Sequence, residues 1–179
     1  MSEPKYIVKP LGNEDRAAFR CGNAALDSYF LERASRDLRE KISAVFILVG
    51  SDDPETVLGY YTLCSQEIDA GEIPPQLRKK LGNYKRVPAT LIGRLARAQE
   101  VRGQGVGELL LLDALKRALD ATASVMSFAV VVDVKEGEDV RAFYEKFGFM
   151  HLAGSRWFLP MKTVEVLFKS RQGDREGRE

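Results

Sequence analysis

Apolar residues recur at helical spacing near the start of the chain. Leu26 and Phe30 lie on one face of a segment that covers residues 23–41, with charged residues between the apolar positions. Asn23 opens this segment, and asparagine is a preferred residue at the N-cap of a helix. The pattern predicts a helix over 23–41, preceded by a short strand at 6–8.

Two continuous apolar segments predict a pair of strands. They cover Ala44–Gly50 and Thr56–Cys64, and the turn-forming residues 51–54 lie between them. We therefore expect an antiparallel hairpin. The segment Ile73–Pro88 is rich in proline and lysine, and it is expected to be a loop with a turn or two of helix around Gln76–Leu81.

A β-α-β pattern occupies the middle of the chain. A strand is expected over Thr90–Ala96, followed by a long apolar-faced helix that extends to Leu119 and by a second buried strand over Val125–Val134. A crossover of this kind is right-handed and makes its two strands parallel. A second helix is predicted over Glu138–Phe147, and Gly148 closes it.

The end of the chain is expected to complete one domain. Two further strands are predicted at Phe149–Leu152 and Thr163–Phe168. Residues 169–179 are charged and poor in apolar side chains, so we expect a tail that does not pack. The predicted fold class is α/β (α+β), with the domain at 1–168.

Composition narrows the class of protein. The 179 residues are 45% hydrophobic, which suits one well-packed domain, and the net charge of +1 predicts no general attraction to nucleic acid or membrane. Cys21 and Cys64 have neither metal-ligand spacing nor the density of a disulfide scaffold, so we expect buried thiols in a reducing compartment. No secretory signal is seen at the start, and no apolar run approaches the ~18 residues of a membrane span. We expect a cytoplasmic protein.

Three glycines on alternate positions precede the central helix. The segment Arg102–Gly107 reads R-G-Q-G-V-G. Backbone N–H groups at a helix N-terminus, together with the helix macrodipole, favour a bound anion, so the segment predicts a phosphate-bearing ligand. It has no Gly-Lys-Ser or Gly-Lys-Thr of a P-loop, and Glu108 stands where a dinucleotide fingerprint has its third glycine. A plain glycine-rich turn is the alternative.

Positive charge is concentrated in one part of the chain. No Asp or Glu occurs from Ile73 to Gln99. The cations inside this segment are Arg78, Lys79, Lys80, Lys85, Arg86, Arg94 and Arg97. In a nearly neutral protein this is a local segregation of charge. It predicts either a solvated basic surface or an electropositive rim for phosphates of a cofactor or a polyanionic substrate.

The second predicted helix carries a candidate catalytic tyrosine. Phe143 and Phe147 are four residues apart, share a face and are expected in the core. Tyr144 lies ~100° further round the axis, so its hydroxyl need not share that burial and would point into the gap between the parallel strands. An ordinary boundary tyrosine is the alternative. His151 is interpreted as structural, and Trp157 as a packing or interface anchor.

Several motifs together resemble one enzyme family. Arg102, Gly105 and Gly107 fill the pattern R/Q-x-x-G-x-G/A, and the motif F-Y-E-K-F-G-F follows at 143–149. With the strand between them, these motifs are similar to the GCN5-related N-acetyltransferases, which bind acetyl-coenzyme A. The resemblance covers most of the chain. It implies a single domain with a mixed, mostly antiparallel sheet, two central splayed parallel strands and flanking helices.

The front half narrows the resemblance further. The segments F-R-C-G-N-A-A-L-D-S-Y-F-L at 19–31, V-L-G-Y-Y-T-L at 57–63 and V-P-A-T-L-I-G-R-L-A at 87–96 resemble the acetyltransferase toxins of bacterial type II toxin–antitoxin systems. Those enzymes acetylate the amino group of aminoacyl-tRNA, stop translation, and are encoded with a ribbon-helix-helix antitoxin. This chain departs from them at Arg97-Ala98, where the toxins usually have Val-Asp, so only backbone contacts carry over there.

The resemblance implies a role for three sets of residues. Tyr144 would donate a proton to the departing thiolate, since a phenol of pKa ~10 stays protonated at neutral pH and suits a thiolate whose acid is near ~8.5. Cofactor binding would involve the backbone of Leu95, Ala96 and Arg97 for the pantetheine arm, and the amides of Arg102, Gly103, Gln104, Gly105, Val106 and Gly107 for the pyrophosphate. Substrate tRNA would meet Arg78, Lys79, Lys80, Lys85, Arg86 and Arg94.

The implied function is acetyl-coenzyme A-dependent N-acetylation of aminoacyl-tRNA, direct and without a covalent enzyme intermediate. The implied partners are a ribbon-helix-helix antitoxin and a second copy of the chain, with apolar residues around Trp157–Leu159 as candidates for the dimer interface. No metal and no membrane contact is expected. Two alternatives stay open: a metabolic or protein N-acetyltransferase acting on a small amine or peptide N-terminus, and a non-catalytic coenzyme A-sensing module.

Overall fold

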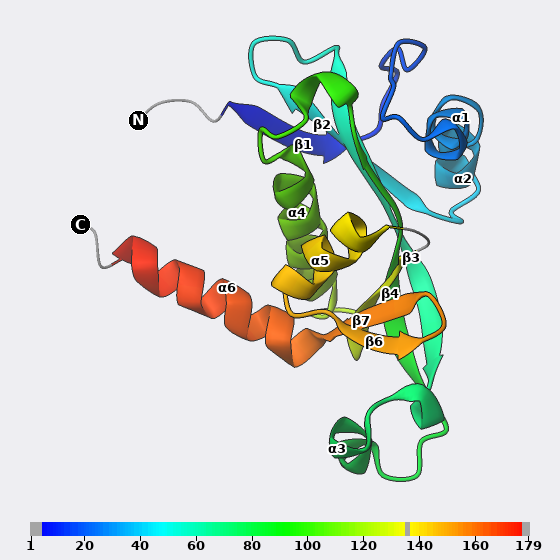
Figure 1. The fold of residues 1–179 in the computed structure, drawn as a ribbon, viewed down its shortest axis with the longest axis vertical. Helices are drawn as coiled ribbons and strands as arrows, with labels where there is room; N and C mark the ends of the chain where they lie inside the picture. Colours follow the sequence, from blue (N-terminus) through cyan, green and yellow to red (C-terminus); the bar gives the residue numbers. More distant parts are fainter. Residues whose placement is uncertain (1–4, 135–136, 177–179) are drawn as a thin grey trace. The chain divides into compact units, whose positions relative to one another are not determined.

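One mixed sheet organises the protein. The structure, a computed structural model, describes residues 5–134 and 137–176 (Figure 1). The strands in this part of the chain pair in the order β1-β2-β3-β4-β5-β7-β6, and β4 and β5 are parallel as expected for the β-α-β unit. The strands are β1 (Tyr6–Pro10), β2 (Ala44–Gly50), β3 (Val57–Asp69), β4 (Arg86–Arg97), β5 (Ala129–Asp133), β6 (Met150–Ala153) and β7 (Arg156–Pro160).

Helices join these strands. The α-helices are α1 (Ala24–Glu32), α2 (Ala34–Arg39), α3 (Pro75–Arg78), α4 (Val106–Ala121), α5 (Glu138–Lys146) and α6 (Met161–Glu176). Short 3-10 turns occur at Ala70–Glu72, Lys79–Leu81 and Gln99–Val101. The chain divides into two compact units, residues 1–64 with 92–114 and residues 65–91 with 115–179. The predicted α+β class is confirmed.

In the first unit, α1 begins where the sequence predicts. The side chain of Asn23 accepts hydrogen bonds from the amides of Ala25 and Leu26 at 3.0 and 3.2 Å, which satisfies two of the unpaired donors of the first turn. The single helix predicted over 23–41 is wrong, because Arg33 leaves helical geometry with φ −118° and separates α1 from α2. Apolar spacing does not reveal such a break, since both short helices keep the same periodicity.

The core of the first unit is aromatic. Phe30 is fully buried and stacks on Tyr60 of β3 with ring centroids 4.2 Å apart. Phe19 meets Phe30 edge to face at 5.0 Å, and the Tyr60 hydroxyl donates to the carbonyl oxygen of Leu26 at 2.8 Å. Aromatic pairs of this geometry add to the stabilisation from burial alone. They hold the α1 segment against β3.

The hairpin β2–β3 of this unit is antiparallel, with Ala44 opposite Leu63 and Ile47 opposite Tyr60. β2 has the limits predicted from its apolar run. β3 is longer than the predicted 56–64, because it continues through polar residues to Asp69. The additional residues of β3 belong to the second unit.

The second unit has its own apolar core. Ile68, Ile73, Val87, Ala89 and Phe158 belong to one buried cluster, with Leu77 and Leu81 packed against it. β5 pairs with β7 in antiparallel register, Ala129 opposite Pro160 and Asp133 opposite Arg156. Gly148 closes α5 with φ +90°, as the sequence predicts, because a residue without Cβ adopts this conformation readily.

One prediction for the C-terminal part is wrong: the expected strand Thr163–Phe168 lies inside α6. The helix continues to Glu176, and residues 169–171 are exposed along it, so the expectation that the tail from 169 does not pack stays a prediction. Val164 is fully buried, and Leu167 and Phe168 are half-buried three and four residues further along, which is the spacing of one helix face. Lys169 forms an i,i+4 ion pair with Glu165 at 3.2 Å.

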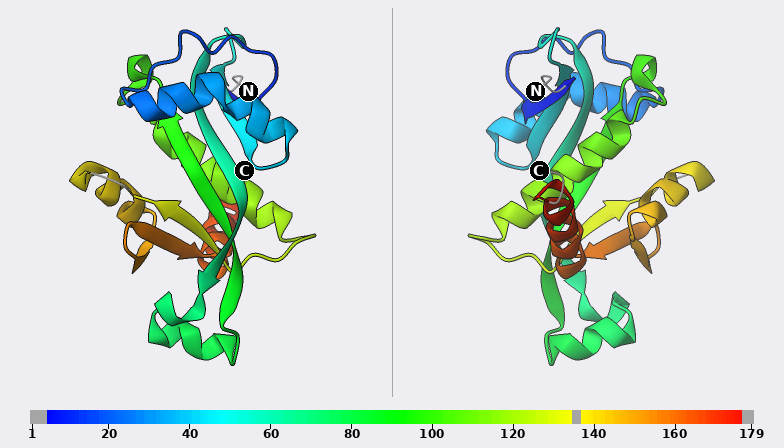
Figure 2. Two further views of the ribbon diagram at one scale, coloured as in Figure 1. Left: turned by 90° about the vertical axis from the view of Figure 1, so that its right-hand side faces the viewer. Right: turned by 90° about the vertical axis from the view of Figure 1, so that its left-hand side faces the viewer.

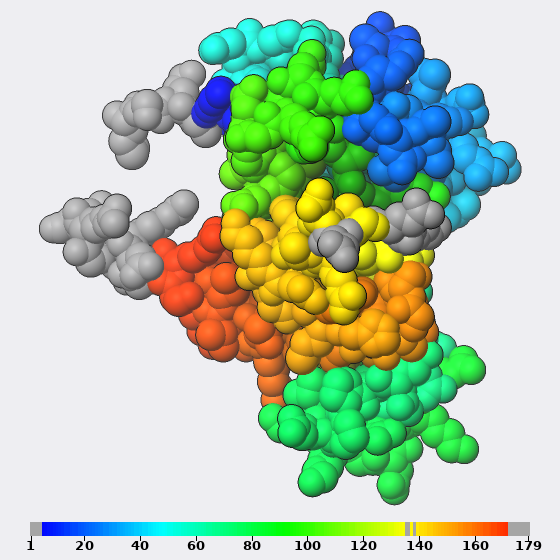
Figure 3. All heavy atoms as spheres, viewed as in Figure 1, coloured from blue at the N-terminus to red at the C-terminus, as the bar shows by residue number. Residues whose placement is uncertain are grey.

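The connection from β3 to β4 forms a projection in the second unit. It covers Ala70–Lys85 and contains α3 and two 3-10 turns, in agreement with the helical turns predicted around Gln76–Leu81. The views in Figure 1 and Figure 2 show it beyond the ends of the two strands that it joins. Its inner side carries Leu77 and Leu81, which anchor it to the buried cluster. Figure 3 shows the teal-green atoms of this segment at the bottom of the view, next to orange atoms.

Candidate functional site

The glycine loop that precedes α4 has an open backbone. Gly103 and Gly105 have φ +76° and +78°, and a Cβ atom built on either would meet no heavy atom within 4 Å. Arg102, Gly103, Gln104 and Gly105 are exposed, whereas Val106 at the start of α4 is fully buried. The two glycines therefore provide a left-handed backbone conformation and free space in front of it.

Backbone donors of this loop are available to a ligand. The amide of Gln104 donates to the carbonyl oxygen of Val101 at 3.2 Å, but no carbonyl of a described residue accepts from the amides of Gly103, Gly105, Val106 or Gly107. Such donors at the start of a helix of 16 residues favour a phosphate group. The residues present therefore fit the pyrophosphate of a coenzyme.

Two residues from the start of the chain hold the loop. The Gln104 side-chain oxygen accepts from the Tyr6 hydroxyl at 2.9 Å and from Lys5 Nζ at 3.4 Å. Lys5 also brings a positive charge beside the loop. Sequence reasoning missed both residues, because they are almost a hundred positions away and no motif links them.

Close packing fixes the start of α4 against β3. A Cβ atom at Gly59 would lie 2.7 Å from Cδ1 of Leu110, 3.1 Å from the carbonyl oxygen of Ala96 and 3.5 Å from Cγ1 of Val106. Glycine is thus required where helix and strand approach. The Tyr61 hydroxyl, on the next residue but one of β3, donates to the carboxylate of Asp113 at 2.5 Å. No pattern in the sequence indicates either contact.

The backbone expected to pair with pantetheine lies in the same unit. Ala96 is buried, and Leu95 and Arg97 are half-buried. After Arg97 the chain remains fixed, because the amide of Ala98 donates to the carbonyl oxygen of Leu58 at 2.8 Å. The assignment of Leu95, Ala96 and Arg97 to the pantetheine arm remains a prediction.

Tyr144 is the most buried aromatic side chain of α5, with 8% of its surface exposed. The prediction that Phe143 and Phe147 lie in the core is wrong, since both are only half-buried, whereas Tyr144, whose burial the spacing left open, is buried. The cause is Phe149, which follows the Gly148 turn and packs edge to face on the Tyr144 ring at 5.3 Å. Phe149 lies beyond the end of the helix, so the helical spacing of apolar residues could not predict this contact.

The environment of Tyr144 keeps its hydroxyl protonated. Burial raises the pKa of Tyr144 to about 12, because the phenolate would be poorly solvated. The hydroxyl forms no hydrogen bond with any residue that the structure describes. It is therefore a neutral donor across the physiological pH range, and its catalytic role stays a prediction.

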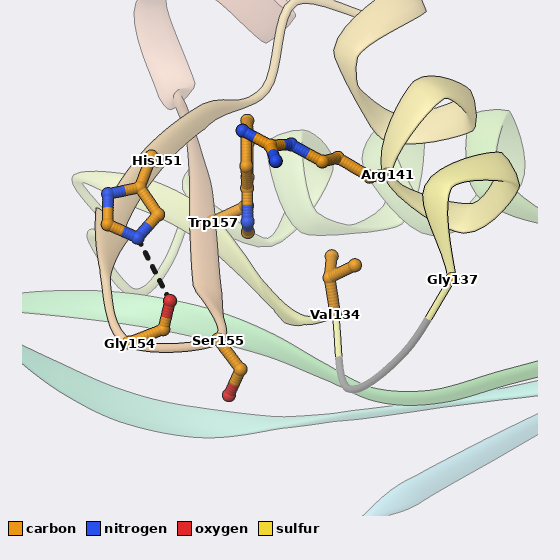
Figure 4. Close-up of a pocket in the computed structure, with 7 residues that line it drawn as sticks. All are labelled: Val134, Gly137, Arg141, His151, Gly154, Ser155 and Trp157. Atoms are coloured by element: carbon orange, nitrogen blue, oxygen red, sulfur yellow. Dashed lines mark hydrogen bonds between the residues drawn. The ribbon is translucent and has the colours of Figure 1, made fainter.

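A hollow of about 380 Å³ lies beside α5 in the second unit. Figure 4 shows Arg141 of α5 next to the Trp157 ring, with His151 on the other side. The guanidinium carbon is 5.0 Å from the ring centroid of Trp157, and His151 meets the same ring edge to face at 5.5 Å. His151 Nε2 lies 2.9 Å from the carbonyl oxygen of Gly154, which supports its structural interpretation.

The proposed dimer contact at Trp157–Leu159 is wrong. Trp157 is 7% exposed, and Phe158 and Leu159 are fully buried in β7, so these residues pack inside the protein. No strand is predicted over these residues from the sequence, so their apolar side chains are interpreted there as a surface patch. Both faces of β7 are in fact covered.

Five of the six residues predicted to meet tRNA lie on or beside the projection. All five are exposed: Arg78, Lys79, Lys80, Lys85 and Arg86. Arg94 is different, since it lies in the first unit and its guanidinium carbon is 3.5 Å from the ring centroid of Tyr29. The Tyr29 hydroxyl donates to Asp37 at 2.9 Å, so Arg94 belongs to a packed network in that unit.

The cysteines are free thiols, and both are half-buried where buried thiols were expected. Burial and the neighbouring Asp27 raise the pKa of Cys21 to about 11, so it is a poor nucleophile at neutral pH. Among the described residues, no group of three or more His, Cys, Asp or Glu side chains could bind a metal ion. Within the same residues, every helix is too short or too polar to cross a bilayer.

Comparison with known proteins identifies the class. Residues 44–151 match the family model of the acetyltransferase (GNAT) domain. The chain belongs to this acetyltransferase family, as its motifs predict.

Its relatives are toxins. It is 31% identical over 173 residues to the "Probable toxin TacT" of Sinorhizobium fredii, covering 91% of this chain and 95% of that one. It is also 31% identical over 136 residues to the tRNA-acetylating toxin of Mycobacterium tuberculosis, covering 76% and 78%. Among solved structures, AtaT complexed with acetyl-methionyl-tRNAfMet has a TM-score of 0.84 at 30% identity, covering 91% of this chain and 99% of that one. AtaTR bound with acetyl-coenzyme A has a TM-score of 0.79 at 32% identity, covering 92% and 98%.

Proposed function

We propose that this protein is a toxin that transfers an acetyl group from acetyl-coenzyme A to the amino group of aminoacyl-tRNA and so blocks translation. The observation that carries the proposal is the likeness to AtaT in complex with acetyl-methionyl-tRNAfMet, which extends over 91% of this chain. The named activity of the mycobacterial relative supports the same substrate. The open glycine loop and the surface cations of the projection supply features that such a reaction requires.

Features of the first unit support the proposed cofactor-binding residues. The amides of the segment Arg102–Gly107 hold the pyrophosphate, since several of them have no protein acceptor and open space lies in front of Gly103 and Gly105. Lys5, beside Gln104, adds a positive charge for the same phosphates. The backbone of Leu95 to Arg97 pairs with the pantetheine arm, and an N–H there polarises the acetyl carbonyl.

The chemistry is direct transfer between two substrates. The substrate amine attacks the thioester carbonyl carbon, a C–N bond forms, and the C–S bond breaks. The attacking nitrogen loses one proton to solvent, and the tyrosine that protonates sulfur recovers a proton from solvent, so the protons balance. An α-amine has a pKa of about 7.7–8.0, so a substantial fraction is neutral at pH 7 without a strong base. Tyr144 is the proton donor to the departing sulfur. Because its pKa is about 12, the proton moves only as negative charge develops on sulfur, and the buried hydroxyl first stabilises that charge as a hydrogen-bond donor.

The basic projection is the surface that meets tRNA phosphates. Its cations lie at the surface, and binding that depends on such contacts weakens steeply with salt. Arg94 is a less favourable candidate than the others, because its charge already faces the Tyr29 ring. The remaining expectations also belong to this proposal: a ribbon-helix-helix antitoxin as partner, a homodimer, and a cytoplasmic location. The complex of AtaT with its antitoxin AtaR supports an antitoxin as partner.

The catalytic assignment is tested by Tyr144→Phe. The substitution removes one hydroxyl that has no hydrogen-bond partner among the described residues, so the variant should fold and bind acetyl-coenzyme A as the unchanged protein does. Turnover should fall by roughly 10²–10⁴-fold, the usual contribution of a general acid. Isothermal titration and initial rates separate the two quantities. Unchanged turnover would remove Tyr144 from the mechanism.

The tRNA surface is tested by reversing charge at Lys79, Lys80 and Lys85. The KM for charged tRNA should rise, and the logarithmic dependence of binding on salt should become shallower by ~0.9 for each duplex phosphate that is no longer neutralised. Activity on a small amine, if any is detected, serves as the reference. An unaltered salt dependence would make this segment an ordinary solvated surface.

A further inference from the structure

The projection exposes an aromatic ring two residues before β4 begins. Tyr84 is 75% exposed, the highest value among the large apolar and aromatic side chains of the described residues. Its ring makes no aromatic or cation–π contact with any of these residues. Packing within the chain therefore does not explain the presence of this tyrosine.

The backbone beneath Tyr84 is well held. Leu77 and Leu81 pack against the buried cluster of the second unit, and the amide of Tyr84 donates to the carbonyl oxygen of Leu81 at 3.3 Å. Gly82, between Leu81 and Tyr84, forms part of a turn and has φ +59°. The inner side of the projection is thus anchored, and Tyr84 stands on a short turn that directs it into solvent.

The segment that carries this ring has an excess of positive charge. The nearby acidic side chains are already engaged: Glu67 pairs with Arg86 at 3.1 Å, and Glu72 pairs with Arg156 at 2.7 Å. Asp69 accepts from the amide of Gly71 at 2.7 Å. Four cations of the projection form no ion pair with a described residue: Arg78, Lys79, Lys80 and Lys85.

We propose that Tyr84 is a stacking platform for an unpaired base at the 3′ end of the tRNA substrate. Unpaired nucleotides are bound by cations that follow the phosphates and by aromatic rings on which the bases stack, and the projection offers both. The amino acid of aminoacyl-tRNA is attached to an unpaired 3′ end, so an enzyme acting on its amine must contact those nucleotides. The inference rests on the proposed function and assigns Tyr84 a positioning role, not a catalytic one.

The first experiment compares Tyr84→Ala with Tyr84→Phe on charged tRNA. Base stacking on an aromatic side chain is worth a factor of about ten or more in affinity, so Tyr84→Ala should raise the KM for charged tRNA about tenfold, with kcat and acetyl-coenzyme A affinity unchanged. Tyr84→Phe should keep the KM, since the ring remains. Met126→Ala is the matched control, because Met126 is 74% exposed and lies outside the projection.

The salt dependence separates stacking from an effect on the cations. Its slope reports the number of phosphate contacts, so Tyr84→Ala should leave the slope unchanged while the KM rises. A changed slope would mean that the substitution merely displaces the neighbouring lysines, and it would overturn the proposal. A KM equal to that of Met126→Ala would overturn it as well.

A double-substitution cycle identifies the base. Charged tRNAs with a single abasic nucleotide among the unpaired 3′ nucleotides should reproduce the KM increase at one position, and there Tyr84→Ala should cause no further increase. Full additivity at every position would contradict stacking.

Weaker antitoxin binding by Tyr84→Ala with an unchanged tRNA KM would assign the ring to a protein partner and overturn the proposal. Failure of the proposed function itself is distinct, since the unchanged protein would then acetylate no charged tRNA.

Discussion

Gly59 connects the packing of the first unit to the cofactor loop, and Gly59→Ala tests that connection. The added Cβ would lie 2.7 Å from Cδ1 of Leu110, well inside the ~3.5–4.0 Å at which carbon atoms make favourable contact. Leu110 is fully buried, so its methyl group has little room to withdraw. The carbonyl oxygen of Ala96, 3.1 Å away, belongs to the backbone and yields even less.

The expected cost follows from these distances. Overpacking of a well-packed core costs ~1–3 kcal/mol, and replacing glycine by alanine returns about 0.4–1 kcal/mol through the unfolded chain. A net loss of ~1–2 kcal/mol corresponds to a fall in Tm of roughly 2–8 °C for a protein of this size. Because Val106 and Ala96 also line the site of the added methyl group, the start of α4 should shift and acetyl-coenzyme A should bind more weakly.

Gly50→Ala is the matched control for this prediction. Gly50 lies in the same unit at the end of β2, and a Cβ atom there meets nothing closer than 3.9 Å. Urea denaturation of both variants gives the two free energies of unfolding, and calorimetric titration gives the affinity for acetyl-coenzyme A. Gly50→Ala should be neutral or stabilising. If Gly59→Ala unfolds at the same urea concentration as Gly50→Ala, the close approach of β3 and α4 is not what holds the loop.

Three further predictions concern the loop, Tyr144 and Cys21. Gly105→Ala and Gly82→Ala both place alanine at positive φ with open space around the methyl group, so each variant should lose about 1–2 kcal/mol of stability. Only Gly105→Ala should weaken acetyl-coenzyme A binding in calorimetric titration. Equal affinities of the two variants would contradict phosphate binding at the loop. The absorbance difference at 295 nm between the unchanged protein and Tyr144→Phe should titrate near pH 12. Because the folded state holds the phenol proton more tightly than the unfolded state, the free energy of unfolding should fall as the pH rises from 10 to 12. An absorbance midpoint near pH 10 would refute the burial of Tyr144. In a Cys64→Ser background, Cys21 should react with a disulfide reagent at pH 8 about tenfold more slowly than a thiol of pKa 9. Its pKa of about 11 leaves about a hundredfold less thiolate, and the greater nucleophilicity of a more basic thiolate offsets part of that loss; a normal rate would show an exposed thiolate.

The sequence predicts correctly those helix and strand limits that are set by residues close by in the chain. β2 has the predicted bounds because its apolar run is continuous and a turn follows it. Asn23 is recognisable as an N-cap because asparagine at that position has a specific hydrogen-bonding role. Gly148 ends α5 because its φ of +90° suits glycine. In each case residues close together in the sequence carry the information.

The wrong predictions concern places where distant contacts decide the structure. The apolar residues of the segment 163–168 fit a strand as readily as a helix, and packing of Val164, Leu167 and Phe168 on one face selects the helix. The burial of Tyr144 depends on Phe149 beyond the helix end. The glycines alone locate the loop at 102–107, but Lys5 acts on it through a contact that no periodicity records.

The central claim is that the protein acetylates aminoacyl-tRNA. The most direct measurement follows radiolabelled acetyl from acetyl-coenzyme A into a pool of charged tRNAs, with deacylated tRNA and Tyr144→Phe as controls. The proposal predicts label only in charged tRNA and only with Tyr144 present, and the labelled isoacceptors would name the amino acid. Tight acetyl-coenzyme A binding without label in any charged tRNA would contradict the claim, and it would direct the search to small amines and peptide N-termini.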